Sequence, residues 1–307
     1  MTNGPDHPVM RLSSRDEDEE MDVVRPSSSR SADDERDALR RLVGRPLFEL
    51  IPLRDALERA EALPAGAVTT VTASPSHGIE ATVELCEGLT ARGHSATPHI
   101  AAHMFRDRSH LGEVLQRCRD AGIREAFAIG GDAKDRGELH DATALLRAMQ
   151  ELGHPFERIG VAAYPEGHPS IPPERLLSSL KEKQTFASYM TTQMTFDADA
   201  ISSWIRSVRT AGVTLPVHIG LPGVANMRKL VGIAGRIGVG GSIRYLRKNR
   251  QVLAALFRRS FTPDRLLEGL GPTLGDPDAN VEALHLFTFN RVAETVAWQR
   301  RWLGDLS

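Results

Sequence analysis

The stretch RIGVAAYPEGHP, residues 158–169, is the most informative part of the sequence. It begins with an apolar run, Ile159–Ala163, that has the length of a buried strand, and it ends in polar and ring-bearing residues that include Tyr164 and His168. A parallel strand that is covered on both faces has a continuous apolar sequence, and α/β barrels carry their functional groups where such strands end. The stretch therefore predicts a strand that leads into the wall of a site. A proline-stiffened surface loop is the alternative interpretation.

The same alternation of short apolar runs and helical patterns continues through most of the chain. Runs with the length of strands occur at Pro46–Ile51, Ala67–Ala73, Ala96–Ala102, Glu125–Gly131, Ile159–Tyr164, Tyr189–Phe196, Pro216–Leu221 and Val281–Phe289. Helical patterns occur at Ile79–Arg92, His110–Ala121, Glu138–Leu152, Arg175–Phe186, Ala198–Ala211, Asn226–Ile237 and Ser242–Ser260. Several of the patterns end in the glycine that helix C-termini favour, at Gly93, Gly122, Gly153 and Gly212.

Eight strands that alternate with helices indicate an α/β protein with the (βα)8 TIM-barrel fold. A doubly wound open sheet is the alternative fold. It lacks its best supporting signature here, because no G-x-G-x-x-G motif follows the first strand.

Composition narrows the class of protein. The chain has 307 residues, of which 41% are hydrophobic and 25% charged, and these are ordinary values for a globular protein. A formal net charge of -2 gives no electrostatic reason to expect a nucleic-acid or membrane partner. Cys86 and Cys118 lie in amphipathic patterns and are expected to be buried free thiols, which suits a cytoplasmic protein. A homo-oligomer is compatible with this composition.

Residues 1–36 differ from the rest of the chain. They contain RDEDEEMD and PSSSRSADDERD and hardly any large apolar residue. Such a segment buries too little surface to offset the entropy of ordering it. We therefore predict a disordered acidic tail over residues 1–36 and a barrel domain over residues 37–307.

In a barrel, the C-terminal ends of the strands converge on one mouth, and several polar residues fall at these ends. Glu49 stands inside the apolar strand LFELIPL, where burial disfavours the charged form of a carboxyl group and suits a general acid. Asp132 follows FAIGG, and Gln193 has an amide that can read the edge of a heterocycle. The alternatives are an outward-facing Glu49, a turn-capping Asp132, a core Gln193 and a core His99. No cluster of residues has metal-ligand spacing, so no metal is expected.

Several motifs resemble those of methylenetetrahydrofolate reductases. They are FELIP, TPHIAA, IGGD, VAAYPEGHP with LLSSLKEK, TTQMTFD and HLFTFNR, and they occur in the same order between about Leu47 and Gly304. The resemblance implies an eight-stranded α/β barrel. It also implies reduction of 5,10-methylenetetrahydrofolate to 5-methyltetrahydrofolate with NADH or NADPH, usually through bound FAD.

The resemblance also implies roles for individual residues. Glu49 matches the acid that assists opening of the five-membered ring of the folate, and Asp132 matches the carboxylate that stabilises the resulting cation. Substrate-binding positions are matched by Gln193, Asn226 and Met227. Flavin-contacting positions are matched by Thr72, His99, Gly131, Asp132, Tyr164, His168 and Lys183, the last across a one-residue gap.

Several departures from the family pattern lie on the flavin and nucleotide side. Ala73 and His140 stand where aromatic residues are usual, Gly130 replaces an arginine, and Met227 stands where an aromatic is expected. Glu49, Asp132 and Gln193 are kept. We therefore expect weakened or absent FAD, with reduced nicotinamide passing its hydride directly to the folate. Folate-dependent methyl transfer, and an inactive folate- or flavin-binding barrel that acts through protein contacts, are the alternative functions.

Overall fold

A computed structural model describes residue 1 and residues 32–131, 138–226 and 261–305. The chain divides into the units Met1–Arg30 and Ser31–Ser307, and the fold below is that of the second unit. Asp132, Met227 and most of the two helices expected within 226–260 lie outside the described residues.

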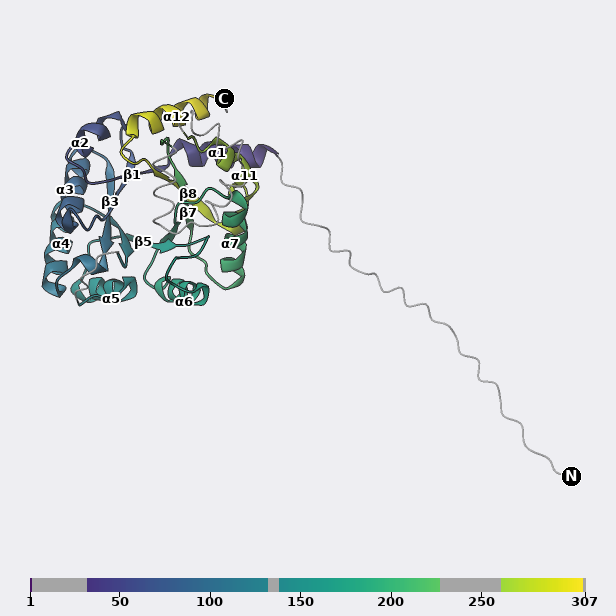
Figure 1. Cartoon of the computed structure of the whole chain (residues 1–307), viewed down its shortest axis with the longest axis horizontal. Helices are drawn as coiled ribbons and strands as arrows, with labels where there is room; N and C mark the ends of the chain where they lie inside the picture. Colours follow the sequence, from purple (N-terminus) through teal and green to yellow (C-terminus); the bar gives the residue numbers. More distant parts are fainter. Residues whose placement is uncertain (2–31, 132–137, 227–260, 306–307) are drawn as a thin grey trace. The chain divides into compact units, whose positions relative to one another are not determined.

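Eight parallel strands close into a barrel in which each strand pairs with the next and β8 pairs with β1 (Figure 1). The strands are β1 Leu47–Leu50, β2 Val68–Val71, β3 Ser95–Ala101, β4 Glu125–Ile129, β5 Arg158–Ala163, β6 Tyr189–Thr192, β7 Val217–Pro222 and β8 Val281–Phe287. Each lies on one of the eight apolar runs, so the predicted barrel is confirmed. The prediction ran too far for β6, which ends at Thr192 and not at Phe196.

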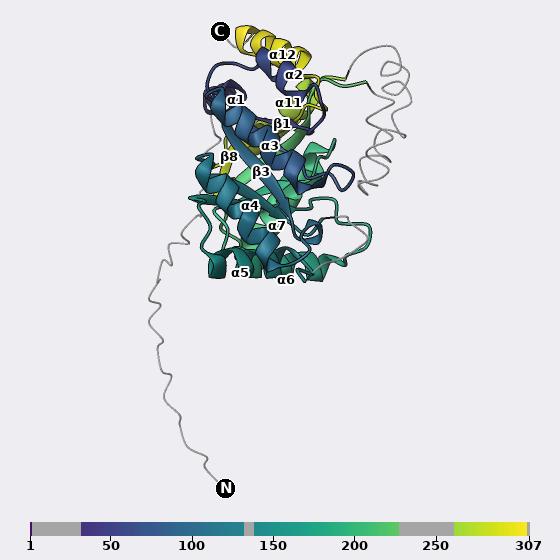
Figure 2. The same cartoon turned by 90° about the vertical axis from the view of Figure 1, so that its left-hand side faces the viewer.

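Helices α3 to α7 lie on the outside of the strands (Figures 1 and 2). The described helices are α1 Ala32–Gly44, α2 Ala56–Arg59, α3 Gly78–Ala91, α4 Arg108–Asp120, α5 Ala142–Leu152, α6 Pro173–Lys183, α7 Ala198–Thr210, α11 Asp264–Leu274 and α12 Val292–Asp305, with 3-10 turns η1 Ala60–Ala62, η2 Ala102–Met104 and η3 Pro277–Ala279. Helix α5 begins later than predicted because Asp141 is its N-cap and accepts a hydrogen bond from the Ala144 N–H (2.8 Å).

Helix α1 begins inside the segment that composition assigned to the tail. Its first turn carries Asp33, Asp34 and Glu35, and acidic side chains are stabilising at the positive end of a helix. Further along, Leu42 and Val43 are buried. The expected boundary at residue 37 therefore falls within a helix that belongs to the barrel unit, and only residues 1–31 remain a predicted tail.

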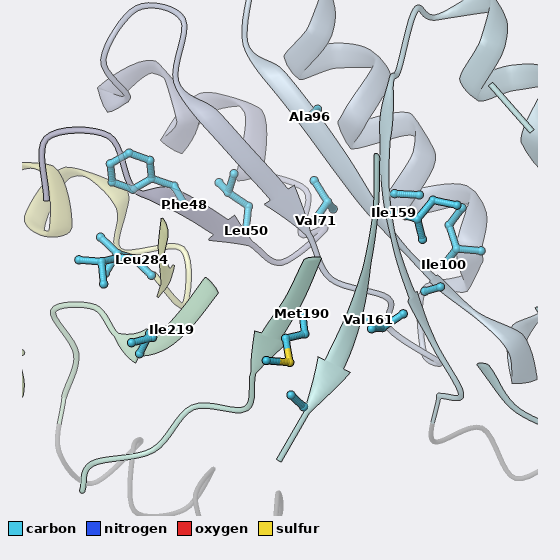
Figure 3. Close-up of a cluster of buried hydrophobic side chains, with 14 of the residues drawn as sticks. Phe48, Leu50, Val71, Ala96, Ile100, Ile159, Val161, Met190, Ile219 and Leu284 are labelled. Carbon is cyan, nitrogen blue, oxygen red and sulfur yellow. The ribbon is translucent and has the colours of Figure 1, made fainter. Parts of the chain in front are cut away.

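The apolar core lies between the strands and the surrounding helices, not inside the barrel. Figure 3 shows strand side chains of this core, among them Phe48, Leu50 and Ile100. Successive side chains of a strand point to opposite faces, so Glu49 and His99, which alternate with these residues, face the barrel interior. The interior of this barrel is consequently rich in polar groups.

Two smaller expectations concern the cysteines and membrane spans. Cys86 and Cys118 are free and buried, as predicted, and burial raises the pKa of the Cys118 thiol to about 12. Among the helices that the structure describes, none has the length and hydropathy that a membrane crossing needs.

Candidate functional site

Glu49 occupies the third position of β1 and is 7% exposed. Its Oε2 lies 2.9 Å from Nε2 of His285 on β8, and its backbone carbonyl accepts a hydrogen bond from Thr288 Oγ1 (2.5 Å). Asn290 continues this seam, because its side chain accepts from the Ile51 N–H (2.8 Å) and donates to the Ile51 carbonyl (2.9 Å). The end of the last strand thus fixes the carboxyl-bearing end of the first.

His99, on β3, faces the same carboxyl group from another side. Its Nε2 lies 3.9 Å from Glu49 Oε2, and the residue is 6% exposed. Burial is the main cause that lowers the pKa of His99 to about 3, and the nearby His285 contributes less. His99 is therefore a neutral ring beside Glu49, and it supplies no positive charge there.

The centre of the barrel has more hydrogen-bonding capacity than its side chains use. Strand register places Thr70 and Thr97 on the same side as Glu49. Their hydroxyl oxygens are buried without a hydrogen-bond partner in the described part of the chain, and so are His99 Nε2 and His285 Nδ1. Buried polar groups normally find a partner, so a polar ligand or water molecules that reach this centre would have groups to bind.

Glu49, His99 and His285 are also residue types that bind metal ions. Ligand atoms of Glu49, His99 and His285 all lie within 4.8 Å of one another. Zinc bonds of about 2.0 Å in tetrahedral geometry would hold two ligand atoms roughly 3.3 Å apart. His285 and Glu49 are closer than that, at the 2.9 Å of a direct hydrogen bond. The arrangement favours a shared proton, and the expectation of no metal stays a prediction.

Two of the predicted residues follow directly on strands and join neighbouring strand ends. The Thr72 N–H donates to the Leu50 carbonyl (2.9 Å), and the Gln193 N–H donates to the Ala163 carbonyl (2.7 Å). Gln193 Oε1 accepts from the Met194 N–H (2.9 Å), while its Nε2 makes no hydrogen bond within the described residues. This leaves the donor side of the amide for a ligand.

Tyr164 and His168, which follow β5, lie against each other with ring centroids 5.2 Å apart in an edge-on arrangement. After β4, Gly131 adopts a positive φ of 87°, and a Cβ there would approach the Cβ of Ala101 to 2.9 Å. A glycine is thus required where the chain after β4 crosses the end of β3.

The other predicted residues are placed differently. Lys183 lies in the last turn of α6 and is 7% exposed, and burial lowers the pKa of its ammonium group. It therefore presents no free cation on an open surface. Asn226 is exposed after β7, and the roles of Asp132 and Met227 lie outside what the structure describes.

His285 is the residue of this site that sequence reasoning missed. It stands in HLFTFNR, a motif that contributes to the family resemblance but implies no particular role for its histidine. The signal that could have found it is the alternation of β8, which places His285 on the interior side between the outward-facing Leu284 and Leu286.

Fold and site together define a (βα)8-barrel protein with a buried carboxyl–imidazole pair at the seam between its first and last strands. The family model of methylenetetrahydrofolate reductase matches residues 52–239, more than half of the chain. The chain belongs to the methylenetetrahydrofolate reductase family. Glu49 and His285 lie outside the matched range, so their roles rest on the geometry and on the motifs around them.

Individual relatives match parts of the chain. A 5,10-methylenetetrahydrofolate reductase of Pectobacterium carotovorum subsp. carotovorum is 30% identical over 159 residues, which cover 50% of this chain and 51% of that protein. A probable methylenetetrahydrofolate reductase (NADPH) of Caenorhabditis elegans is 32% identical over 117 residues, 36% of this chain and 17% of that protein. The matched parts thus span about half of the bacterial relative and less of the animal one.

A solved structure shares the fold. It is an uncharacterized protein from Clostridium thermocellum that binds two copies of 5-methyl-5,6,7,8-tetrahydrofolic acid. It aligns with a TM-score of 0.57 at 11% identity and covers 88% of this chain and 99% of its own. At this identity the likeness extends to the fold alone.

Proposed function

We propose that this protein reduces 5,10-methylenetetrahydrofolate to 5-methyltetrahydrofolate, with reduced nicotinamide as the hydride donor. The observation that carries the proposal is Glu49, a buried carboxyl group at the C-terminal end of β1 that is held by His285. Family membership supports the same reaction class.

The reaction needs a proton and a hydride at different atoms. Protonation of N10 of the folate breaks its bond to the bridging methylene and leaves an iminium cation at N5. Addition of hydride to the iminium carbon then forms the methyl group and leaves the oxidised nicotinamide. In this proposal Glu49 supplies the proton as the general acid and is reprotonated from solvent, because it is the buried carboxyl group that His285 holds at the end of β1.

Gln193 would orient the pterin. Its amide Nε2 makes no hydrogen bond within the described residues, so it can donate to the heterocycle, whose edge carries acceptors. The backbone N–H of Gln193 donates to the carbonyl of Ala163, the residue before Tyr164 at the end of β5. Asp132 is proposed from the resemblance to stabilise the iminium cation.

The residues at the expected flavin positions fit a flavin dinucleotide poorly. A pyrophosphate is held best by exposed cations and charge-assisted hydrogen bonds. Among the described residues assigned to the flavin, Lys183 is the one lysine or arginine, and it is buried in the last turn of α6. Gly130 stands where the family has an arginine. We therefore propose direct hydride transfer from nicotinamide to the folate and derive no step through FAD.

The test is a coupled measurement on purified full-length protein. We expect oxidation of NADH or NADPH only when methylenetetrahydrofolate is present, 5-methyltetrahydrofolate as the product, little flavin absorbance, and no acceleration by added FAD. Stoichiometric bound flavin, or activity that depends on added FAD, would restore the two-step mechanism. Methyl transfer without nicotinamide oxidation, or folate binding without turnover, would replace the reductase assignment.

A further inference from the structure

His285 and Glu49 meet across the seam that closes the barrel. Nε2 of His285 lies 2.9 Å from Oε2 of Glu49, and the two residues are 2% and 7% exposed. They come from β8 and β1, whose positions along the chain differ by 236 residues. A contact between such distant and fully packed residues is fixed by the closed barrel, since neither side chain has room to turn away.

Strand register shows from which direction the histidine approaches. His285 is level with Leu47, whereas Glu49 is level with Phe287, further along both strands. His285 therefore supports the carboxyl group from the side of the strand N-termini. Glu49 Oε2 is held from this side, and Oε1 makes no hydrogen bond in the described part of the chain.

The other described groups that the strands place around the pair carry no charge. His99 of β3 is neutral, with its Nε2 3.9 Å from Glu49 Oε2. Thr70 and Thr97 contribute hydroxyl groups, and Phe287 contributes an apolar ring whose centroid lies 4.9 Å from that of His285. On β7, the neighbouring strand, Gly220 is level with His285, and His218 bonds to Glu282 instead. His285 is thus the hydrogen-bond partner of the Glu49 carboxyl group among the described residues.

A donor on one oxygen determines where the acid proton sits. A neutral carboxyl group has one carbonyl oxygen, which only accepts, and one hydroxyl oxygen, which donates. If His285 donates its Nε2–H to Oε2, the acid proton is left on Oε1. After the proton leaves, the same hydrogen bond becomes charge-assisted and strengthens. A contact that strengthens as charge develops lowers the energy of the transition state for proton transfer more than the energy of the ground state.

We propose that His285 is a positioning residue for Glu49: in its Nε2–H form it holds Oε2 and directs the acid proton on Oε1 to the folate. This inference rests on the proposed reductase function. It extends that function to a residue outside the range matched by the family model.

The first test compares variants by steady-state kinetics. His285→Ala should lower kcat roughly 10- to 100-fold, the equivalent of one hydrogen bond to a charged group, with little change in the KM for the folate. His285→Gln, whose amide can donate to the same oxygen, should recover most of the loss. The matched control is His218→Ala, which removes a second buried strand histidine that bonds to a glutamate and should leave kcat unchanged.

A double-mutant cycle separates positioning from general damage. If His285 acts through Glu49, His285→Ala should cost nothing further in a Glu49→Gln background. Equal losses in both backgrounds, or no rescue by glutamine, would overturn the proposal.

A second measurement does not depend on turnover. Nitrogen NMR of the histidine rings should show His285 protonated at Nε2 and bare at Nδ1, with a change in the Nε2 signal in Glu49→Gln. Protonation at Nδ1 alone would overturn the proposal even in an active enzyme. The expected Nε2–H form in a protein that fails to reduce methylenetetrahydrofolate would instead overturn the proposed function while leaving the His285–Glu49 geometry supported.

Discussion

The described barrel strands carry two histidine–glutamate pairs with the same 2.9 Å contact and different surroundings. His285 and Glu49 form one, and His218 and Glu282 form the other. Glu282 also accepts a hydrogen bond from Arg158 (2.6 Å), and its side chain is 38% exposed, whereas that of Glu49 is 9% exposed with no cation bonded to it among the described residues. The hydrogen bonds from His218 and Arg158 lower the pKa of Glu282, whereas among the described residues Glu49 has a histidine partner and no arginine.

The positions of the pairs along the strands match this difference. His218 and Glu282 are second in β7 and β8, and Arg158 and Tyr189 are first in β5 and β6. The His218 ring stacks on Tyr189 at 4.1 Å, and the Arg158 guanidinium lies over the same ring at 5.1 Å. In barrels the N-terminal strand ends carry stability and the C-terminal ends carry chemistry. We therefore expect the His285–Glu49 pair to serve the chemistry and the His218–Glu282 pair, which an arginine accompanies, to serve stability.

The largest effect is expected from removing the acid group of the His285–Glu49 pair. Glu49→Gln should lower reductase turnover roughly 10²- to 10⁴-fold, the contribution of one general acid, and leave the fold intact. Glu282→Gln is the matched control, because it neutralises the histidine-bonded glutamate at the other end of the barrel strands, and it should keep near wild-type turnover. Stopped assays of 5-methyltetrahydrofolate formation measure both. Comparable losses in the two variants would show that the pairs do not differ in role.

A smaller kinetic effect is expected from a residue outside both pairs. Gln193→Ala should raise the KM for methylenetetrahydrofolate roughly 3- to 10-fold, the equivalent of one neutral hydrogen bond, and leave the KM for reduced nicotinamide unchanged. Titration of each substrate at saturating levels of the other measures this. A selective rise for nicotinamide would assign Gln193 to the other ligand and leave the folate contacts near Glu49 unidentified.

The barrel itself could be predicted from sequence because apolar run length and helix patterns report strands and helices directly. The site was accessible only in part. Glu49 was recognisable as a carboxyl group inside an apolar run, but strands covered on both faces give no sequence sign of which neighbours meet across the barrel. His285 was missed for this reason. Helix α1 was missed because its charged first turn resembles the tail before it, and α11 because Pro272 lies within it.

The His218–Glu282 pair should affect how the stability of the protein depends on pH in the acid range. The hydrogen bond from His218, with further help from Arg158, lowers the pKa of Glu282 from 4.5 to about 2. Stability from a lowered glutamate pKa is fully present above about pH 4.5 and is lost as the pH falls through about 2. Melting temperatures of wild type and Glu282→Gln should thus differ most above pH 4.5 and converge toward pH 2, and added salt should reduce the difference because the side chain is partly exposed. Parallel curves would mean that the ion pair contributes nothing to stability.

The smallest effect is expected from removing residues 1–31, which should change neither pair. Their composition offers almost no apolar surface for packing, so melting temperature and turnover should match those of the full chain.

Extending the deletion through Gly44 is the contrasting variant. It removes α1, whose Leu42 and Val43 are buried and whose Val43 carbonyl accepts a hydrogen bond from Gln299 Nε2 of α12 (2.8 Å). Helix α1 also contacts β8, the strand that carries both His285 and Glu282. The longer deletion should therefore lower the melting temperature by several degrees, at about 2–4 °C per kcal/mol for a domain of this size. A loss of stability in the shorter deletion would place part of the acidic segment in contact with the barrel.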